Sequence, residues 1–195
     1  MEENNKGLKL DLKNARNAYN FIVTTPRDAS NTVYGEICRE LANAKEEILI
    51  CSPWITYIVD ELSELSSFKE KKGKKKINLK IITRLIKEDI EKGVTDLEKF
   101  RVLEKIGANI RYNNDLHAKM VIADGSTAII SSANLTKKGL YVNYEAGICL
   151  RDRRKVNEVT RFFNEVWEES MPLTEKSIIL CLSEQKESMN TKKKT

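Results

Sequence analysis

Short apolar runs alternate with segments of helical periodicity along the first part of the chain. Runs of strand length occur at residues 47–52, 77–85 and 108–112. Apolar side chains recur every three or four positions over residues 33–44, 55–65, 97–106 and 156–166, which is the spacing of amphipathic helices that face a core. Strands that alternate with helices predict βαβ units, with parallel strand pairing and helices on both faces of the sheet.

Antiparallel strands follow in the second half of the chain. Apolar runs at residues 117–123 and 126–131 flank Asp124-Gly125, a dipeptide typical of a two-residue hairpin turn. A further strand is predicted at residues 144–150, an edge strand at residues 21–25, and a strand or cap at residues 177–182. The predicted fold class is therefore α/β, with a mixed, largely parallel β-sheet flanked by helices on both faces.

The length of 195 residues suits one domain with a substantial core. We place this domain at residues 30–170, between an N-terminal extension over residues 1–29, which holds the edge strand, and a C-terminal extension over residues 171–195, which ends in a basic tail. The sequence has no internal repeat, so each motif is expected in a single copy.

The composition is mildly basic and carries no export signal. The 34 Lys and Arg residues against 29 Asp and Glu residues give a net charge of +5, which leaves nucleic acid and anionic lipid both open as partners. The N-terminal segment lacks an apolar signal core and no apolar run has membrane-spanning length, so we expect a cytoplasmic protein without a transmembrane segment. The four cysteines lie far apart, without a C-x-x-C pair, and there is one histidine, which argues against a structural zinc site and favours reduced thiols.

The single histidine, His117, lies two residues before Lys119 in an apolar run. Alternate residues of a strand share a face, so the imidazole and the ammonium are predicted side by side. With the two-residue turn, Ser132 lies opposite His117, and Asn134 follows just beyond the strand end. Taken singly, a lone histidine is more often a core or edge residue, and a lone lysine is usually solvated. Their combination with a hydroxyl and an amide indicates a site for a tetrahedral anion.

These residues resemble the signature of the phospholipase D superfamily, which is H-x-K, four residues, D, and then G-S-x-N. His117, Lys119 and Asp124 match its first part, and residues 131–134 read Ser-Ser-Ala-Asn where the family usually has Gly-Ser-x-Asn. Downstream, the sequence N-Y-E-A-G places Glu145 where members carry an acidic partner for the histidine. The resemblance covers residues 48–167 and identifies residues 30–170 as a phospholipase D-like catalytic domain.

The resemblance implies a phosphodiesterase that works through a covalent phosphohistidine, without a metal or other cofactor. His117 is then the nucleophile, and Glu145 is the carboxylate that orients its ring. The groups that hold the phosphate oxygens are Lys119, Ser132 and Asn134. Asp124 lies at the turn and off the face of His117, so we expect its carboxylate to bond backbone amides and to have a structural role.

Superfamily members bring two motifs together across one site, whereas this chain has one motif and one histidine. A second acid is needed to protonate the leaving oxygen. The resemblance therefore implies a homodimer in which His117 of each subunit enters a shared site, as nucleophile or as acid.

Side chains near the predicted strand ends are candidates for substrate binding: Ser52, Trp54, Arg84, Arg111 and Lys137. The lysine run at residues 69–76 can follow a phosphate backbone, although a solvated turn is the simpler interpretation. An endonuclease acting on DNA or RNA is the first interpretation. A phospholipid phosphodiesterase is the alternative among enzymes, although the sequence shows no basic amphipathic helix with a large apolar face. A non-catalytic dimeric nucleic-acid-binding module, with a helicase or restriction system as partner, is the alternative from another class.

Overall fold

The computed structural model describes residues 19–26, 32–71 and 76–183. Within these residues, eight strands form one sheet in the order β1-β7-β6-β5-β2-β3-β4-β8. The strands are β1 (Tyr19–Thr24), β2 (Glu47–Cys51), β3 (Asn78–Thr83), β4 (Asn109–Tyr112), β5 (Met120–Ala123), β6 (Thr127–Ser131), β7 (Glu145–Leu150) and β8 (Met171–Pro172). Outside the described residues lie the N-terminal segment before Tyr19, residues 72–75 of the lysine run at residues 69–76, and the basic tail after Ser183.

Strand pairing confirms the mixed sheet, but its parallel part is smaller than the sequence predicted. β2 pairs with β3 and β3 with β4 in parallel. The other neighbouring pairs in the described sheet are antiparallel. The difference arises because the β5–β6 hairpin joins the free side of β2 in the antiparallel direction, and β7 and β1 then add to it in turn.

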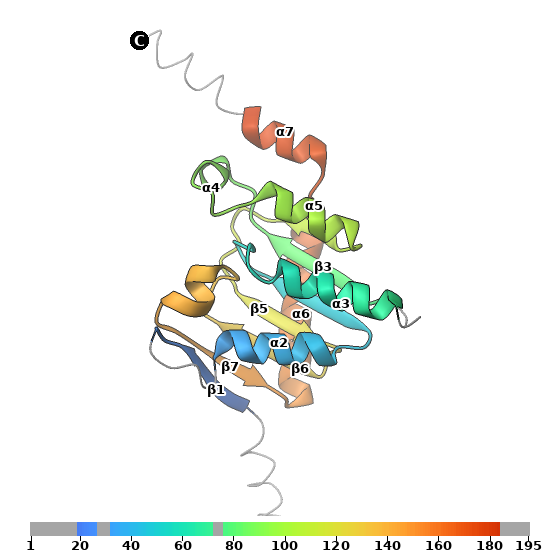
Figure 1. Cartoon of the computed structure of the whole chain (residues 1–195), viewed down its shortest axis with the longest axis vertical. Coiled ribbons are helices and arrows are strands. Elements are labelled where there is room, and N and C mark those ends of the chain that lie inside the picture. Colours follow the sequence, from blue (N-terminus) through green and yellow to red (C-terminus); the bar gives the residue numbers. More distant parts are fainter. Residues whose placement is uncertain (1–18, 27–31, 72–75, 184–195) are drawn as a thin grey trace, which may run out of the picture.

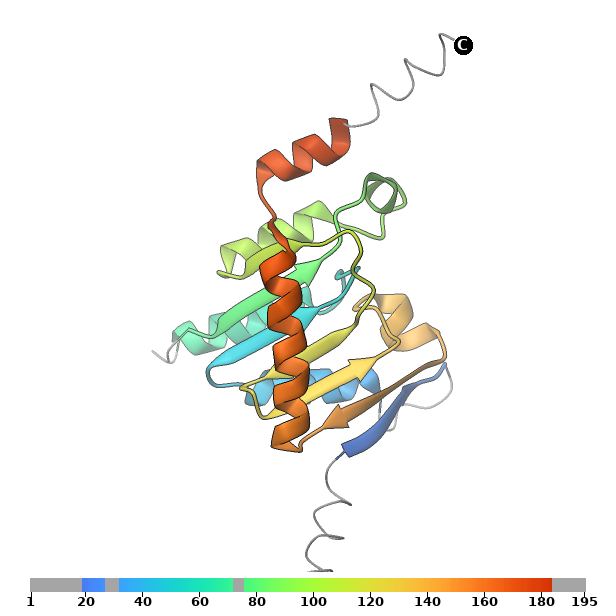
Figure 2. The same ribbon diagram turned by 180° about the vertical axis from the view of Figure 1, so that it is seen from behind.

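Helices cover both faces of the sheet, as predicted. Figure 1 shows α2 (Val33–Asn43), α3 (Val59–Lys71) and α5 (Leu97–Lys105) on one face. On the other face, α6 (Arg153–Glu169) crosses the strands diagonally (Figure 2). The predicted apolar stripes account for this packing, because Ile37 and Leu41 of α2 lie in the larger core, and Phe163 of α6 lies in the second core, beneath the opposite face.

Both predicted extensions contribute described strands to the sheet. β1 is the edge strand beside β7, and the two-residue strand β8 pairs with β4 at the opposite edge. After β8 the chain forms α7 (Glu175–Ser183), where the sequence allowed a strand or a cap. A short apolar run does not distinguish a helix from a strand by periodicity. The short helix α4 (Lys87–Glu91) follows β3 and was not predicted either.

The hairpin after β5 has a three-residue loop, and the predicted two-residue loop is wrong. Ala123 pairs with Thr127 and Met120 with Ile130, so the register differs by one residue from the predicted one. Asp124 and Gly125 both have positive φ, at 51° and 57°. A third loop residue, Ser126, then completes the turn and donates its backbone N–H to the carbonyl of Ala123 at 3.0 Å.

The carboxylate of Asp124 joins this loop to the start of β2. It accepts hydrogen bonds from the backbone N–H groups of Lys45, Glu46 and Glu47 at 2.8, 2.8 and 2.9 Å. The backbone N–H of Asp124 in turn donates to the carbonyl of Glu47. The amides are distant in the sequence rather than local to the turn, so the carboxylate fixes one strand of the sheet against another.

Replacing Asp124 is expected to destabilise the fold. Asp124→Gly removes the acceptor but tolerates the positive φ, and we expect it to lower the free energy of unfolding by about 2–3 kcal/mol, measured by urea denaturation. Asp124→Ala should cost about 1 kcal/mol more, because alanine is also strained in the left-handed region. Asp124→Asn keeps an acceptor and tolerates this conformation, so it should be the mildest change. An Asp124→Gly variant as stable as the wild type would contradict this role.

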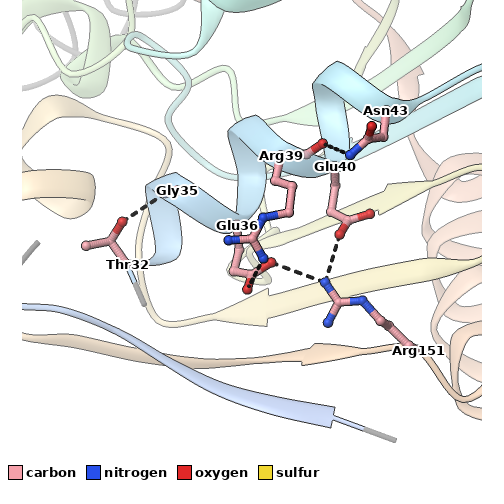
Figure 3. Close-up of polar contacts among 7 residues, drawn as sticks. All are labelled: Thr32, Gly35, Glu36, Arg39, Glu40, Asn43 and Arg151. Atoms are coloured by element: carbon pink, nitrogen blue, oxygen red, sulfur yellow. Dashed lines mark hydrogen bonds and ion pairs between the residues drawn. The ribbon is translucent and has the colours of Figure 1, made fainter. Parts of the chain in front are cut away.

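An ion-pair cluster around the buried Glu36 holds α2 over the end of β7 (Figure 3). Glu36 is 2% exposed and pairs with Arg39 at 2.8 Å and with Arg151 at 3.2 Å. Arg151 also pairs with Glu40 at 2.9 Å. Glu36, Glu40 and Cys149 form the one grouping of potential metal ligands in the described part of the chain. The Arg151 guanidinium donates to both carboxylates, and this ion pairing explains why the two acidic side chains lie close together.

Candidate functional site

The candidate site lies at the ends of the central strands, where β2, β3 and β6 end and β5 and β7 begin. His117 and Lys119 belong to the segment that leads into β5, rather than to the strand itself as predicted. The backbone carbonyl of Lys119 still accepts from the N–H of Ser131 at 3.2 Å, which continues the hairpin pairing by one step.

The side chains of His117 and Lys119 lie together, as their spacing predicted. His117 is exposed, whereas Lys119 is 7% exposed. The Lys119 Nζ atom lies 3.3 Å from both ring nitrogens of His117 and donates to the His117 carbonyl oxygen at 2.7 Å. An exposed imidazole thus borders a fixed cation, an arrangement that can bind a phosphate oxygen beside a nucleophile.

The groups around Lys119 shift its pKa in opposite directions. Burial lowers the pKa of Lys119 below the ordinary lysine value, and the neighbouring Arg84 lowers it further. The Glu145 carboxylate opposes both effects and favours the ammonium. Beside Lys119, burial raises the pKa of the Cys51 thiol to about 12, so this thiol stays protonated at neutral pH. Glu145 is therefore the acidic group that supports the charge of the site lysine.

Ser132, Glu145 and Asn143 form a hydrogen-bonded group at the start of β7. The Ser132 hydroxyl donates to Glu145 Oε2, and the Asn143 amide donates to Glu145 Oε1 at 2.9 Å. Ser132 Oγ also accepts from the backbone N–H of Ala146 at 3.1 Å. Asn143 was not singled out in the sequence, although its position two residues before Glu145 was the available signal.

Two contacts expected for His117 are not formed. Among the described residues, Glu145 accepts from Ser132 and Asn143 and not from His117. Ser132 does not lie opposite His117 either, because the three-residue loop moves the pairing by one position. The orientation of His117 by Glu145 therefore stays a prediction.

Asn134 lies just beyond β6, as predicted, and the following segment holds it in place. Its side-chain oxygen is buried and has no partner among the described residues. The π-helix η1 (Lys138–Val142) packs directly on its backbone: a Cβ atom added to Gly139 would lie 2.4 Å from the Asn134 carbonyl oxygen. Gly139 is a second residue that no sequence pattern singled out, and only glycine permits this approach.

Ser131, the departure from the family signature, is accommodated opposite Gly147 of β7. A Cβ atom added to Gly147 would lie 2.7 Å from Ser131 Cβ and 2.5 Å from the Ile130 carbonyl oxygen. The absence of a side chain at residue 147 therefore gives the serine its space.

The predicted substrate-binding residues fall into two groups. Arg84 and Trp54 lie at the site edge: the guanidinium carbon of Arg84 is 5.3 Å from the centre of a Trp54 ring, and Arg84 pairs with Asp89 at 2.7 Å. Lys137 is exposed immediately before η1. These three residues remain candidates for substrate contact.

Ser52 and Arg111 have structural contacts instead. Ser52 is fully buried and links two loops, because its hydroxyl donates to the Trp54 carbonyl at 3.0 Å and accepts from the Leu135 N–H at 3.4 Å. Arg111 packs 4.6 Å from the centre of a Trp167 ring and donates to the Trp167 carbonyl at 2.6 Å, which ties β4 to α6. Their positions near strand ends suggested the site, but their side chains belong to the protein interior and to helix packing.

The structure thus places an exposed histidine beside a buried lysine, where the central strands of a mixed α/β sheet begin or end. A family model described as "Cardiolipin synthase, PLD-like domain" matches residues 37–167. The chain therefore belongs to the phospholipase D-like family, which confirms the resemblance found in the sequence.

Relatives in this family include larger proteins. Cardiolipin synthase 1 of Bacillus cereus is 25% identical over 166 residues, which cover 82% of this chain and 31% of that protein. Cardiolipin synthase 1 of Bacillus anthracis is 24% identical over 167 residues, with the same coverage of 82% and 31%. The chain thus spans less than a third of the length of these relatives.

Solved structures with the same fold include smaller proteins. Nuc, a phospholipase D family member from Salmonella typhimurium, superposes with a TM-score of 0.60 and 18% identity over 80% of this chain and 98% of its own. NucT from Helicobacter pylori has a TM-score of 0.64 and 15% identity over 80% and 99%. TrmBL2, an archaeal chromatin protein described with a novel mode of DNA binding, has a TM-score of 0.55 and 19% identity over 88% and 63%. Among the described helices of this chain, none combines the length and apolar composition needed to cross a bilayer.

Proposed function

We propose that the chain is a metal-independent endonuclease that cleaves DNA or RNA through a covalent phosphohistidine on His117, at a site shared across a homodimer. The observation that supports it is the exposed His117 imidazole with the Lys119 ammonium 3.3 Å from both ring nitrogens. A neutral ring nitrogen beside a buried cation can attack a phosphate whose negative charge the same cation offsets.

In the first step, an unprotonated ring nitrogen of His117 forms a bond to phosphorus as the bond from phosphorus to the leaving oxygen breaks. Lys119 offsets charge on the non-bridging oxygens, and the Asn134 amide and Ser132 hydroxyl donate to them. In this structure the Ser132 hydroxyl donates to Glu145, so donation to phosphate requires it to rotate. In the second step, water attacks the phosphohistidine, the P–N bond breaks and the histidine is restored.

The leaving oxygen needs a proton in the first step, and the attacking water must lose one in the second. His117 of the partner subunit can supply the first proton as imidazolium and accept the second as neutral imidazole. A two-fold axis would place the same residue of both chains at one site. This requirement is the reason for proposing a homodimer.

Nucleic acid is the proposed substrate, and phospholipid is the alternative. The net charge of +5 and the exposed Lys137 suit a polyanion. The cardiolipin synthase relatives favour phospholipid hydrolysis as the second enzyme function. The fold shared with TrmBL2 favours a DNA-binding module without catalysis, and a helicase or restriction-system partner would fit that function.

Cleavage is expected to persist in excess EDTA, because the proposed site uses a histidine and a lysine and has one carboxylate, Glu145. The measurement is the incubation of labelled single- and double-stranded DNA, RNA and a phospholipid with the protein, with and without chelator. His117→Ala controls for contaminating nucleases. Loss of cleavage on chelation, with recovery in magnesium or manganese, would contradict the mechanism. Retention of DNA in a gel without a change in its length would support the binding module instead.

A further inference from the structure

The segment that connects Asn134 to Glu145 has both of its ends at the candidate site and presents an exposed aromatic surface. Tyr141, Val142 and Tyr144 are 42%, 51% and 71% exposed. Lys137 and Lys138 of the same segment are exposed as well. In Figure 1 this segment holds the short orange helix beside the start of α2, at the same end of the sheet as the start of β7. We call residues 137–144 the tyrosine platform.

Contacts with the core and with neighbouring loops and rings hold the tyrosine platform in place. Leu140 is 1% exposed in the core, and Gly139 packs on the backbone of Asn134. The Tyr141 ring lies 4.8 Å from the Tyr34 ring and 5.2 Å from the Tyr57 ring, measured between centroids. Exposed rings on a fixed backbone lose little conformational freedom when a ligand stacks on them.

The exposed side chains combine the two groups that single-stranded nucleic acid requires. Aromatic rings stack on unpaired bases of any sequence, and lysines contact the phosphates between them. In a duplex the bases stack on one another and their faces are not accessible to a tyrosine. A surface of this kind therefore selects single strands over duplexes.

We propose that the tyrosine platform binds the bases next to the cleaved phosphate and makes single-stranded nucleic acid the preferred substrate. This rests on the proposed nuclease function and specifies its substrate. Tyr144, the most exposed ring, stacks on a base, and Lys137 and Lys138 contact the adjacent phosphates. Tyrosine and lysine also suit a lipid interface, but the only leucine of the platform is buried, which leaves Val142 as its exposed aliphatic side chain.

The test measures binding of a dT oligonucleotide and a duplex of equal length by fluorescence anisotropy, with full-length protein that carries His117→Ala to prevent cleavage. Tyr144→Ala and Tyr144→Leu should each weaken binding of the single strand about fivefold or more, the effect of losing one stacked ring, with a smaller effect on the duplex. Tyr144→Phe should bind as the wild type does. Tyr19→Ala on β1, where Tyr19 is 58% exposed, is the matched control for loss of an exposed tyrosine and should have no effect.

Three results would overturn the platform. Equal losses on single strand and duplex would show that the ring does not select unpaired bases, and unchanged binding in Tyr144→Ala would remove the ring from the contact. Binding to vesicles of anionic phospholipid that Tyr144→Leu retains and Tyr144→Ala loses would assign the surface to lipid.

Failure of the proposed function gives a different result. A wild-type protein that hydrolyses neither nucleic acid nor a small diester such as methyl p-nitrophenyl phosphate is not a phosphodiesterase, yet the binding comparison still reports on the platform. Conversely, hydrolysis of the small diester with no dependence of single-strand binding on Tyr144 would leave the chemistry in place and reject the platform.

Discussion

Activity is expected to fall with the square of the wild-type fraction when wild-type and His117→Ala subunits are mixed. The proposed mechanism uses His117 of one subunit as nucleophile and His117 of its partner as acid, so a mixed dimer lacks one of the two groups. Co-refolding equal amounts, with random pairing, leaves about a quarter of the dimers wholly wild type. Activity at constant total protein should then be roughly that fraction of the wild-type value.

The shape of the mixing curve distinguishes the shared site from independent sites. Independent sites give activity in proportion to the wild-type fraction, which is a straight line. Sedimentation of the mixtures controls for dimer formation, and mixing with Tyr19→Ala subunits controls for the refolding procedure. A straight line, or a fully active monomer, would reject the shared site even if His117 proved essential.

Glu145→Gln is expected to lower kcat by about 100-fold or more with little change in substrate affinity. The substitution preserves the shape of the side chain but removes the negative charge that favours the Lys119 ammonium, and that we propose orients the His117 ring. Steady-state kinetics on a small phosphodiester separate kcat from KM. Asn143→Ala removes one hydrogen bond to Glu145 without changing its charge, so it should lower kcat less.

The same variant should also move the alkaline limb of activity to lower pH. Burial already lowers the pKa of Lys119, and the Glu145 carboxylate partly offsets that effect. Without the carboxylate, the ammonium loses its proton at a still lower pH, and with it the charge that holds the phosphate. An unchanged rate and pH profile in Glu145→Gln would remove Glu145 from the site.

The sequence predicted the sheet and its helices from local patterns, and it failed where local patterns are equivalent. Apolar runs located β2, β3 and β4, and the helical spacing located α2, α5 and α6. The direction of β5 against β2 depends on which edge of the sheet a hairpin joins, and periodicity does not record that choice. The six-residue run at 177–182 is too short for its periodicity to distinguish a helix from a strand, and tertiary packing made it part of α7.

The hairpin register was predicted wrongly because the loop has one residue more than the Asp-Gly pattern indicates. Asp-Gly is compatible with a two-residue turn, but Asp124 here also binds three amides at the start of β2, a distant contact that no local rule contains. The one-residue difference then removed the predicted opposition of His117 and Ser132. The chemical grouping of His117 with Lys119 was still found, because it depends on a spacing of two and not on the partner strand.

Residues at strand ends could be selected from the sequence but not oriented. Arg84 and Arg111 both lie near the ends of neighbouring parallel strands, yet Arg84 lies near Lys119 while Arg111 packs on α6. Which face a side chain takes depends on pairing register and on the helix above it. The role of Gly139 could not be predicted from the sequence, because it is to leave space for the Asn134 backbone.

The link between Asp124 and β2 gives the spacing of the signature a physical meaning. The four residues between Lys119 and Asp124 are β5 itself, Met120–Ala123. The lysine belongs to the site at one end of that strand, and the aspartate is tied to the start of β2 at the other. The interval in the motif is therefore the length of one strand, set by the distance along β5 from the contact of Asp124 with β2 to the site at Lys119. Inserting or deleting one residue would reverse the faces of all that follow it, so the interval should tolerate substitution far better than a change of length.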